Sequence, residues 1–348
     1  MFWLSVENLA NEEQKAYWMP KLRNVDILGC YAQTELGHGS NVAGLETTAT
    51  LDKATDEFVI NSPTVTSAKY WPGDLGRNTS HAVVFARLLV DENDYGVQPF
   101  MVQLRDTDSW KYRPGVRTGD LGQKYGYTSK DNGWATFDHV RIPRTNMLMG
   151  LCEVNKEGEF SLVGDPRVLY SVMMYIRMLI VAECGNITMG ASQIGLRYCA
   201  VRRQFATYQK SRVERCVLDY QTTQHTFAPL LASGTAMQVC AGWVVEEFKK
   251  MMDEIKIQDY RRMDGMHHVL AGFKALMTDS MIANVETARR ACGGAGYTNN
   301  SGFTELYQNA SPMPTYEGEN TVMLLQAVRY LIKLTKKVEK GEKLPFPF

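Results

Sequence analysis

Residues 180–201 read IVAECGNITMGASQIGLRYCAV and decide the class of fold. Their apolar positions step by alternating fours and threes, which places the side chains on one face of an α-helix. These positions are Ile180, Cys184, Ile187, Ala191, Ile194, Tyr198 and Val201. Gly185, Gly190 and Gly195 interrupt this helix, and each glycine lowers helix propensity by about 1 kcal/mol relative to alanine. We therefore expect another helix to pack closely against this one.

Three more amphipathic patterns follow towards the C terminus. Their apolar positions are Val244, Phe248, Met251 and Ile255, then Leu270, Phe273, Met277 and Met281, then Leu324, Ala327, Leu331, Leu334 and Val338. Four such helices predict an up-and-down four-helix bundle. Residues 293–296 are expected to cap the third helix, and residues 311–319 to form a loop that leads to an N-cap at Asn320.

The sequence before the bundle has the texture of β-structure. From residue 27 to 149, short β-branched and aromatic runs alternate with turns: TTATLD, EFVIN, HAVVFARLLV, PFMVQLR and ATFDHVRI. This spacing is typical of an all-β barrel or sandwich. Seven of the 12 prolines lie between Pro20 and Pro166, whereas residues 167–311 contain only Pro229. We predict an α+β multi-domain chain with a β-barrel over 27–150 and the bundle over 151–348.

Composition excludes several partners. The 38 basic and 38 acidic side chains balance to +0, so no nucleic-acid partner is implied. The most apolar stretch, residues 169–182, is shorter than the roughly 20 residues that span a bilayer and contains Arg177. No membrane span is therefore expected. The seven cysteines form no CxxC pair and are interpreted as small buried apolar residues.

Common catalytic motifs do not occur in the chain. It contains no GxGxxG, no GxxxxGK[ST] and no GxSxG, which argues against the usual nicotinamide, ATP and serine-nucleophile sites. The six histidines show no spacing suited to zinc. We expect no metal site.

Four segments are unusual for their context. They are CYAQTELGHGSN at 30–41, KYWPGDLG at 69–76, AVRRQF at 200–205, and ACGGAGY at 291–297 followed by PTYEGENTV at 314–322. Taken in this order, they resemble the acyl-CoA oxidase family, a flavoprotein branch related to the acyl-CoA dehydrogenases. The resemblance covers about residues 12–338. It implies FAD bound by the 27–150 barrel, with residues 1–26 a remnant of an N-terminal helical domain and without the family's second C-terminal helical domain.

The resemblance assigns two flavin contacts in the barrel. Thr34 resembles the threonine whose hydroxyl and backbone contact the flavin ring. Gly73 resembles a glycine whose backbone approaches the ring, where a Cβ would obstruct it. The alternatives are an ordinary threonine at a strand end and a simple turn glycine. Asp74 stands where the family usually has a second glycine, so its effect on the flavin stays open.

Other cofactor and substrate contacts are assigned to the bundle. Arg203 and Gln204 resemble residues that reach the FAD pyrophosphate of a neighbouring subunit, and arginine suits phosphate through its planar donor fork. Gly293 and Gly294, with Gly296, resemble the loop against which a second subunit's adenosine lies. The resemblance thus implies a homodimer or larger assembly. A solvated helix end is the alternative for the arginine.

Arg177, in YSVMMYIR, resembles a residue near the CoA entrance, although Ser171 replaces the glycine usual in the family. The assignment of Arg177 to substrate binding rests on this match.

Glu317, in YEGEN, resembles the catalytic base of the family. A glutamate in a loop before a helix is otherwise a solvated acid or a partner of the helix dipole, and Glu319 fits that description two residues later. The resemblance implies that Glu317 removes the α-proton of a fatty acyl-CoA. Its backbone N–H and a flavin ribityl hydroxyl would hold the thioester oxygen.

The activity implied is oxidation of fatty acyl-CoA to trans-2-enoyl-CoA, the first step of fatty acid β-oxidation, with O₂ reduced to H₂O₂. Two alternatives remain: an acyl-CoA dehydrogenase that passes electrons to a flavoprotein carrier, and a truncated, non-catalytic structural subunit. By analogy with the family the location is peroxisomal, with a mitochondrial location as the alternative.

Overall fold

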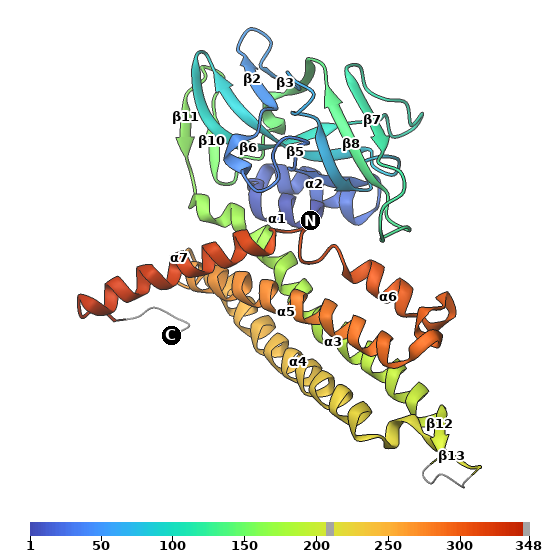
Figure 1. Cartoon of the computed structure of the whole chain (residues 1–348). Coiled ribbons are helices and arrows are strands. Elements are labelled where there is room, and N and C mark those ends of the chain that lie inside the picture. Colours follow the sequence, from blue (N-terminus) through green and yellow to red (C-terminus); the bar gives the residue numbers. More distant parts are fainter. Residues whose placement is uncertain (207–211, 344–348) are drawn as a thin grey trace. The chain divides into compact units, whose positions relative to one another are not determined.

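The computed structural model describes residues 1–206 and 212–343, which divide into two compact units, Met1–Val172 and Met173–Phe348 (Figure 1). The units separate later in the chain than residue 150 because a hairpin, β10 (Cys152–Val154) and β11 (Phe160–Leu162), belongs to the first unit. Cys152 and Val154 are buried in the core of that unit.

The first unit begins with two helices, α1 (Phe2–Leu9) and α2 (Glu12–Arg23). A capping box begins α2, in which the Asn11 and Gln14 side chains each accept the other residue's backbone N–H. The Gln14 amide also donates to the carbonyl oxygens of Thr145 at 2.8 Å and Met147 at 2.5 Å. These bonds fix α2 to the strand-rich part of the unit, where Trp18 is buried.

Two sheets make up the rest of the first unit, as Figure 1 shows. A six-stranded sheet has the order β1-β5-β2-β3-β9, with β6 paired to β5, and a three-stranded sheet has the order β4-β8-β7. The strands are β1 (Gly29–Ala32), β2 (Thr48–Asp52), β3 (Glu57–Asn61), β4 (Lys69–Gly73), β5 (His81–Val90), β6 (Asn93–Gln103), β7 (Val116–Asp120), β8 (Asn132–Phe137) and β9 (Val140–Pro143). Short 3₁₀ helices lie at η1 (Val42–Gly44), η2 (Arg144–Asn146) and η3 (Pro166–Tyr170).

The curled arrangement of these sheets confirms the predicted barrel-like domain. The runs EFVIN and HAVVFARLLV coincide with β3 and β5. Eight of the ten β5 residues are buried, since β5 pairs with β1, β2 and β6 and contributes side chains to two apolar clusters. The run ATFDHVRI differs from the prediction of one strand. It is split between β8 and β9 at His139, whose φ of 50° turns the chain.

The second unit is a helical bundle, which confirms the predicted architecture (Figure 1). Its helices are α3 (Ser171–Val201), α4 (Gln221–Lys256), α5 (Met263–Ala291), α6 (Phe303–Ala310) and α7 (Asn320–Glu339). A hairpin of β12 (Arg203–Ala206) and β13 (Glu214–Cys216) follows α3. The 3₁₀ helices are η4 (Val217–Asp219), η5 (Gly293–Tyr297) and η6 (Asn299–Ser301).

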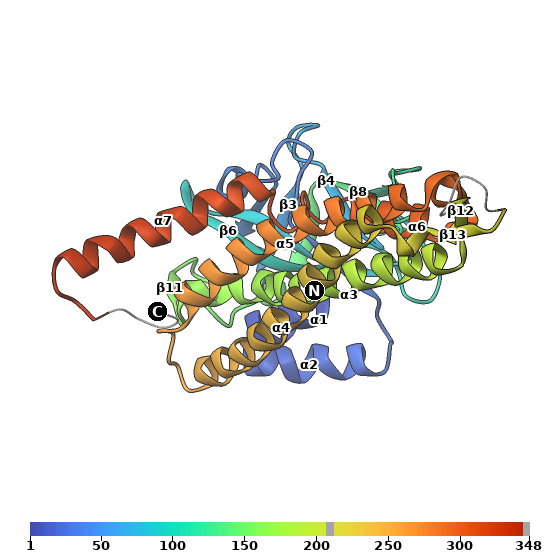
Figure 2. The same ribbon diagram turned by 60° about the horizontal axis from the view of Figure 1, so that its bottom comes forward.

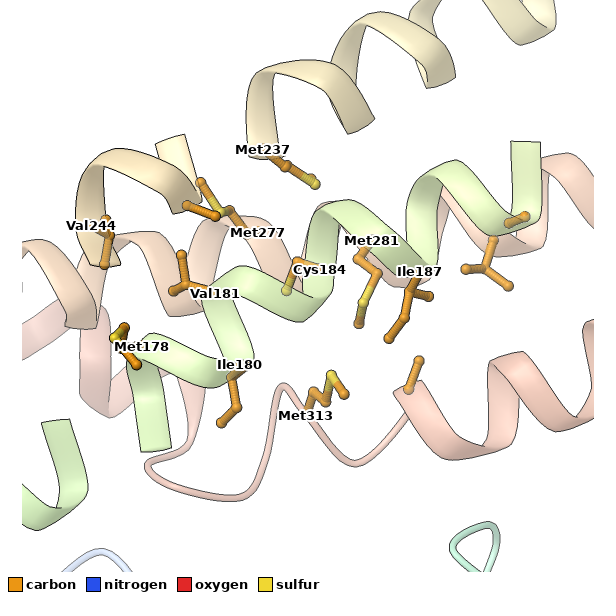
Figure 3. Packing of buried hydrophobic residues seen from close by; sticks show 14 of the residues in the cluster. Met178, Ile180, Val181, Cys184, Ile187, Met237, Val244, Met277, Met281 and Met313 are labelled. Atoms are coloured by element: carbon orange, nitrogen blue, oxygen red, sulfur yellow. The ribbon is translucent and has the colours of Figure 1, made fainter. Parts of the chain in front are cut away.

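The core of the bundle is rich in methionine, and Figure 3 shows α3 contributing to it with side chains of α4 and α5. Glycines on α3 allow the helices to approach. A Cβ on Gly185 would lie 3.0 Å from the backbone nitrogen of Gln238, and one on Gly195 would lie 2.6 Å from the Phe227 ring. These two contacts confirm the expected close neighbour. Gly190 differs, because nothing lies within 4 Å of its Cβ position.

Helix α7 departs from the predicted pattern. Ala327 and Leu334 are buried, but Leu324, Leu331 and Val338 are exposed, although they share the same predicted apolar face. The buried start of α7 packs on α5, where Met323 joins a small cluster. Figures 1 and 2 show the C-terminal end of α7 projecting away from α4 and α5. Its second half still contacts α5, because the Tyr330 ring stacks on His268 and Lys333 forms an ion pair with Asp264 at 3.2 Å.

Two helical stretches, Pro166–Val201 and Gln221–Lys256, are long and apolar enough to cross a bilayer by length and composition alone. The expectation of no membrane span rests on the continuous apolar run at 169–182. These two stretches are longer because they also include the polar positions of each helix. Core helices of a bundle meet the same criterion, and Val181, Phe227 and Val244 from these helices are buried in one cluster. The most apolar window is 56% buried in the first stretch and 28% buried in the second.

The predicted burial of the cysteines holds for five of them, whereas Cys216 and Cys240 are half-buried, and all seven thiols are free.

Candidate functional site

Glu317 lies in the loop at 311–319 between α6 and α7. Its φ is 55° and that of Gly318 is 105°. Glycine adopts such values without steric cost, but a glutamate at positive φ is strained and needs surrounding contacts to hold it. Met313 anchors the other half of the loop, because its side chain points into the bundle core (Figure 3).

Two buried cations hold the backbone of this loop. The Arg177 guanidinium on α3 donates from Nε to the carbonyl oxygen of Glu317 at 2.8 Å. The Lys274 ammonium on α5 donates to the carbonyl oxygen of Gly318 at 2.6 Å. Arg177 is 5% exposed and Lys274 is 0% exposed. Two helices of the bundle therefore fix consecutive peptide groups at the strained position.

Lys274 also joins the loop to α7 through Asn320. Its ammonium lies 2.9 Å from Asn320 Oδ1. The Asn320 amide nitrogen in turn donates to the Ala275 carbonyl oxygen at 3.1 Å, to Thr278 Oγ1 at 3.0 Å and to Asp279 Oδ1 at 2.8 Å. Asn320 was expected to be the N-cap of this helix, and that expectation is wrong.

Glu319 is the N-cap of α7, and its carboxylate accepts the backbone N–H groups of Thr321 at 2.9 Å and Val322 at 3.3 Å. These backbone donors lower the pKa of the Glu319 carboxyl group. Asn320 faces α5 instead, since its amide can bond four groups that a cap could not reach. The interpretation of Glu319 as an acid that serves the helix start is confirmed.

The environment of the Glu317 carboxyl group is different. The residue is half-buried, and this burial raises the pKa of its carboxyl group. Arg177 and Lys274 act in the opposite direction through their positive charges. Within residues 1–206 and 212–343, no hydrogen bond or ion pair engages the carboxylate or the Glu317 backbone N–H. An acid with a raised pKa and a neighbouring N–H donor are the groups that proton abstraction beside a carbonyl requires.

His267 also lies next to Arg177. Its Nδ1 lies 3.4 Å from Arg177 Nη1, and its Nε2 lies 3.1 Å from Gln326 Oε1 on α7. Burial, together with the charge of Arg177, lowers the pKa of His267 to about 4. The imidazole is therefore neutral at physiological pH and adds no charge to the site.

Thr34 and Gly73 lie close together in the first unit. The Thr34 carbonyl oxygen accepts the backbone N–H of Tyr70 at 2.9 Å, and Gly73 is three residues further along β4. The Thr34 hydroxyl makes no hydrogen bond to any residue that the structure describes. Both predicted flavin contacts thus belong to one edge of the unit.

A buried ion pair supports this edge. Glu35 Oε1 lies 3.0 Å from Lys69 Nζ, and both side chains are fully buried. The Glu35 carboxylate also accepts the Thr47 hydroxyl at 2.6 Å, and the Lys69 ammonium donates to the Gln33 carbonyl oxygen at 3.1 Å. Burial lowers the pKa of Lys69 to about 8, although the Glu35 charge opposes this. The residues before and after Thr34 are thereby fixed.

Asp74 follows Gly73 with a φ of 68°. Its carboxylate forms an ion pair with Lys130 at 2.5 Å, and both side chains are about two-fifths exposed. The Lys130 side chain also fills the space next to Gly73, where its Cε would lie 2.5 Å from an added Cβ. Asp74 therefore points towards Lys130, and its charge is compensated.

Arg203 and Gln204 lie on β12 rather than on a helix end, because α3 ends at Val201. Arg203 is exposed, and its Nη1 donates to the Glu214 carbonyl oxygen at 2.9 Å across the hairpin. The Gln204 carbonyl oxygen accepts the Tyr220 hydroxyl at 2.8 Å. Within residues 1–206 and 212–343, the bond to the Glu214 carbonyl oxygen is the hydrogen bond that the Arg203 guanidinium makes, and it orients the side chain along the hairpin.

The glycine loop lies at the same end of the bundle. The Cys199 thiol, near the end of α3, donates to the Ala291 carbonyl oxygen at 3.8 Å, just before η5. Gly293 and Gly294 are exposed, and nothing lies within 4 Å of a Cβ on either one. Gly296 has a different role, because its Cβ would overlap the carbonyl oxygen of Arg289.

The predicted residues therefore form three groups. Thr34 and Gly73 belong to the first unit, whereas Arg177 contacts Glu317 in the second unit. Arg203 follows the far end of α3, about 36 Å from Arg177 along the helix at 1.5 Å per residue. Sequence reasoning missed Lys274, the contacts of Asn320 with α5, and the pair of Glu35 with Lys69. A signal for Lys274 existed, because it occupies a core position between Leu270 and Met277.

No group of three or more metal-binding side chains occurs in the part of the chain that the structure describes. The cavity of about 420 Å³ in the second unit lies elsewhere, between the α4–α5 turn and α7, and is lined by charged residues such as Arg261 and Lys333. It takes in none of the predicted site residues.

Comparison with known protein families gives two matches. Residues 170–332 match the acyl-CoA oxidase C-alpha1 domain, and residues 30–140 match the acyl-CoA dehydrogenase middle domain. Peroxisomal acyl-coenzyme A oxidase 1 of Arabidopsis thaliana is 43% identical over 346 residues, which are 98% of this chain and 52% of the relative. The chain thus spans about half the length of the curated relatives it matches.

Solved structures agree with the sequence matches. An acyl-CoA oxidase from tomato, LeACX1, has a TM-score of 0.95 and 44% identity over 99% of this chain and 53% of its own. Acyl-CoA oxidase-2 of Caenorhabditis elegans, bound with FAD, ascaroside-CoA and ATP, has a TM-score of 0.94 and 39% identity over 98% of this chain and 51% of its own. With both domain families matched in order, this chain belongs to the acyl-CoA oxidase family.

Proposed function

We propose that the chain is the flavin-binding core of an enzyme that oxidises fatty acyl-CoA to trans-2-enoyl-CoA, with Glu317 as the base. The observation that carries the proposal is the Glu317 loop. A strained glutamate has its carbonyl oxygen bonded to buried Arg177, while its carboxyl group and N–H have no partner among the described residues. Backbone strain held in place by buried contacts is a feature of functional sites.

The chemistry requires the two groups that this loop presents. The α-proton of a thioester is weakly acidic, so its removal needs a positioned base and a donor to the carbonyl oxygen on which charge develops. Glu317 would supply both, its carboxylate as proton acceptor and its N–H as donor. Arg177 and Lys274 offset the effect of burial on the pKa, which favours the ionised carboxylate. We assign two roles to Arg177: it orients the Glu317 loop, and it lies near the CoA entrance as the resemblance implies.

The residues present fit FAD. The Thr34 hydroxyl has no partner among the described residues, and the bare backbone of Gly293 and Gly294 leaves room for a planar group. The exposed Arg203 fork suits the pyrophosphate, with Gln204 beside it. FAD, when bound, accepts the β-hydrogen as hydride. Thr34 and Gly73 would hold its ring, and the glycine loop and Arg203 its adenosine diphosphate part.

The proposal includes reoxidation by O₂ to H₂O₂ and a peroxisomal location. Both rest on the relatives: the matched proteins carry the name peroxisomal acyl-coenzyme A oxidase. The substrate class rests on the same names and on the ascaroside-CoA bound to the C. elegans relative. Release of peroxide under air distinguishes this function from a dehydrogenase, which would need an added electron acceptor.

Substitution of the base tests the proposal. Glu317→Gln keeps size and hydrogen-bonding capacity but cannot accept the proton. Mixed with saturated acyl-CoA without O₂, the FAD-loaded variant should bleach its oxidised flavin band about 10² to 10⁴-fold more slowly than the parent. Binding of FAD and acyl-CoA should be retained.

Glu319→Gln is the matched control, since Glu319 is an acid two residues away that caps α7. This variant should bleach at close to the parent rate. A slow Glu319→Gln beside a fast Glu317→Gln would show that the wrong carboxylate is assigned. Equal bleaching rates in the parent, Glu317→Gln and Glu319→Gln would show that the catalytic base does not lie in this loop.

A further inference from the structure

We infer that Lys274 is a positioning residue for Glu317: its ammonium group fixes the Gly318 carbonyl and the Asn320 side chain and so holds Glu317 in its strained conformation. This inference rests on the proposed role of Glu317 as the base. Lys274 itself would touch neither substrate nor cofactor.

The geometry sets Lys274 apart from an ordinary helix lysine. Its side chain is fully buried on α5, and it has two oxygen partners, the Gly318 carbonyl at 2.6 Å and Asn320 Oδ1 at 2.9 Å. Both partners follow Glu317 within three residues. A buried ammonium group is costly unless it is paired and hydrogen-bonded. Here the ammonium group is paired with the carbonyl oxygen of Gly318, a glycine at positive φ. This pairing indicates that the position of the carbonyl group is important for the Glu317 loop.

The sequence position leads to the same view. Leu270, Lys274, Met277 and Met281 step by four, three and four residues along one face of α5. A fold that needed only packing would place an apolar side chain at the second position. Neighbouring Ala271 and Ala275 instead leave space for α7, where they contact Met323. The lysine is thus the polar exception on the face that meets the Glu317 loop.

Several charged groups surround the ammonium group. Arg177 from α3 adds positive charge, whereas Glu317 and Glu319 from the loop and Asp279 from α5 add negative charge. Burial, followed by the charge of Arg177, lowers the pKa of Lys274 to about 8. His267, also on α5, is neutral. Lys274 is therefore charged at neutral pH and favours ionisation of Glu317.

Lys274→Met tests this role, because methionine keeps much of the volume but neither the charge nor the donor. Two readouts are needed. Hydrogen exchange of the 311–320 segment in the chain without FAD should become faster, on the order of tenfold, since a charged hydrogen bond to the loop is lost. In the FAD-loaded chain, the acid limb of the pH–rate profile for anaerobic bleaching should move upward by on the order of one pH unit.

Met281→Ala is the control for a purely structural effect. Met281 is fully buried on the same helix and belongs to the apolar core. Its truncation should lower the melting temperature but leave the acid limb in place. Lys274→Gln, which keeps a neutral donor, carries the test if Lys274→Met does not fold, and it should show the shift of the acid limb.

The outcomes separate this inference from the proposed function. If Glu317→Gln slows bleaching while Lys274→Met and Lys274→Gln both retain the parent's acid limb and exchange rates, Lys274 has no positioning role. If Glu317→Gln bleaches like the parent, the proposed function fails. Exchange of the loop in the flavin-free chain still reports in that case whether Lys274 holds it.

Discussion

A glutamate at positive φ with a raised pKa is unfavourable for the folded state, and this is the most informative residue-scale feature of the bundle. Two buried cations are committed to its loop, Arg177 and Lys274, each on a carbonyl oxygen. The fold would gain nothing from this arrangement if Glu317 were a solvated acid. Destabilising features that the surroundings hold in place are expected where a residue is kept for chemistry.

The raised pKa of Glu317 predicts a stability effect with a defined sign. A carboxyl group whose pKa is raised by folding contributes stability below its unfolded pKa of about 4.5, and this contribution is lost as pH rises through the folded pKa. At pH 7 the ionised carboxylate is therefore a net cost. Glu317→Gln should raise the melting temperature at pH 7, and the difference should shrink as pH falls towards 4.5.

Substitution of Glu319 should change the melting temperature in the opposite direction. The Glu319 carboxyl group has a lowered pKa because it accepts backbone N–H groups at the start of α7. Its contribution is present above the unfolded pKa and is lost as pH falls through the folded pKa. Glu319→Gln should therefore lower the melting temperature at pH 7. A Glu317→Gln protein that melts below the parent at pH 7 would contradict the raised pKa of the Glu317 carboxyl group.

At this scale the sequence identified Glu317 by resemblance but could not reveal its surroundings. Spacing along one helix shows which residues share a face, not which oxygen of another segment that face meets. The contact of Lys274 with Gly318 spans 44 residues, and that of Arg177 with Glu317 spans 140. The N-cap was misplaced by one residue, because asparagine is a preferred N-cap residue and glutamate is not. The contacts of Asn320 with α5, which no local pattern shows, leave the cap to Glu319.

The elements themselves were predicted well where local patterns govern them. β3 and β5 coincide with the runs found in the sequence, and each predicted bundle helix is present. The hairpin of β12 and β13 after α3 was not predicted. The exposure of Leu324, Leu331 and Val338 on α7 was not predicted either. An amphipathic stripe shows that a helix has an apolar face, but not which residues of that face a partner helix covers.

The glycine loop after α5 allows a prediction with a matched pair. Gly294→Ala adds a Cβ where nothing lies within 4 Å, so the chain should fold as the parent does. Because this backbone is assigned to the adenosine part of FAD, the variant should bind FAD more weakly. Gly296→Ala should instead lower the melting temperature, because its Cβ overlaps the Arg289 carbonyl oxygen. Titration of FAD by fluorescence, with thermal melts, distinguishes the two effects.

If Gly294→Ala folds normally and binds FAD with unchanged affinity, this loop does not contact the cofactor. A stable Gly296→Ala would show that the end of α5 can shift to accept a side chain.

At the scale of the whole molecule, the assigned FAD contacts are divided between the two units. The resemblance assigns Thr34 to the flavin ring and Arg203 to the pyrophosphate bound by a neighbouring subunit. If the site is shared in this way, Arg203→Ala and Thr34→Val should each lower FAD affinity when pure. A mixture should recover up to half of the sites, since one site of a mixed dimer has both native residues.

Mixed assemblies must be demonstrated by differently tagged subunits. If these form and the FAD affinity of the mixture stays at the level of the single variants, both residues belong to the site of one chain.

The absorbance spectrum of the purified chain under substrate tests the central claim most directly. After incubation with FAD, the protein should retain an oxidised flavin band through gel filtration. One equivalent of saturated fatty acyl-CoA per flavin, added without O₂, should bleach that band, and admission of air should restore it with release of about one H₂O₂ per flavin. A preparation that stays colourless after incubation with FAD, or a flavin band that acyl-CoA leaves unchanged, would contradict the account.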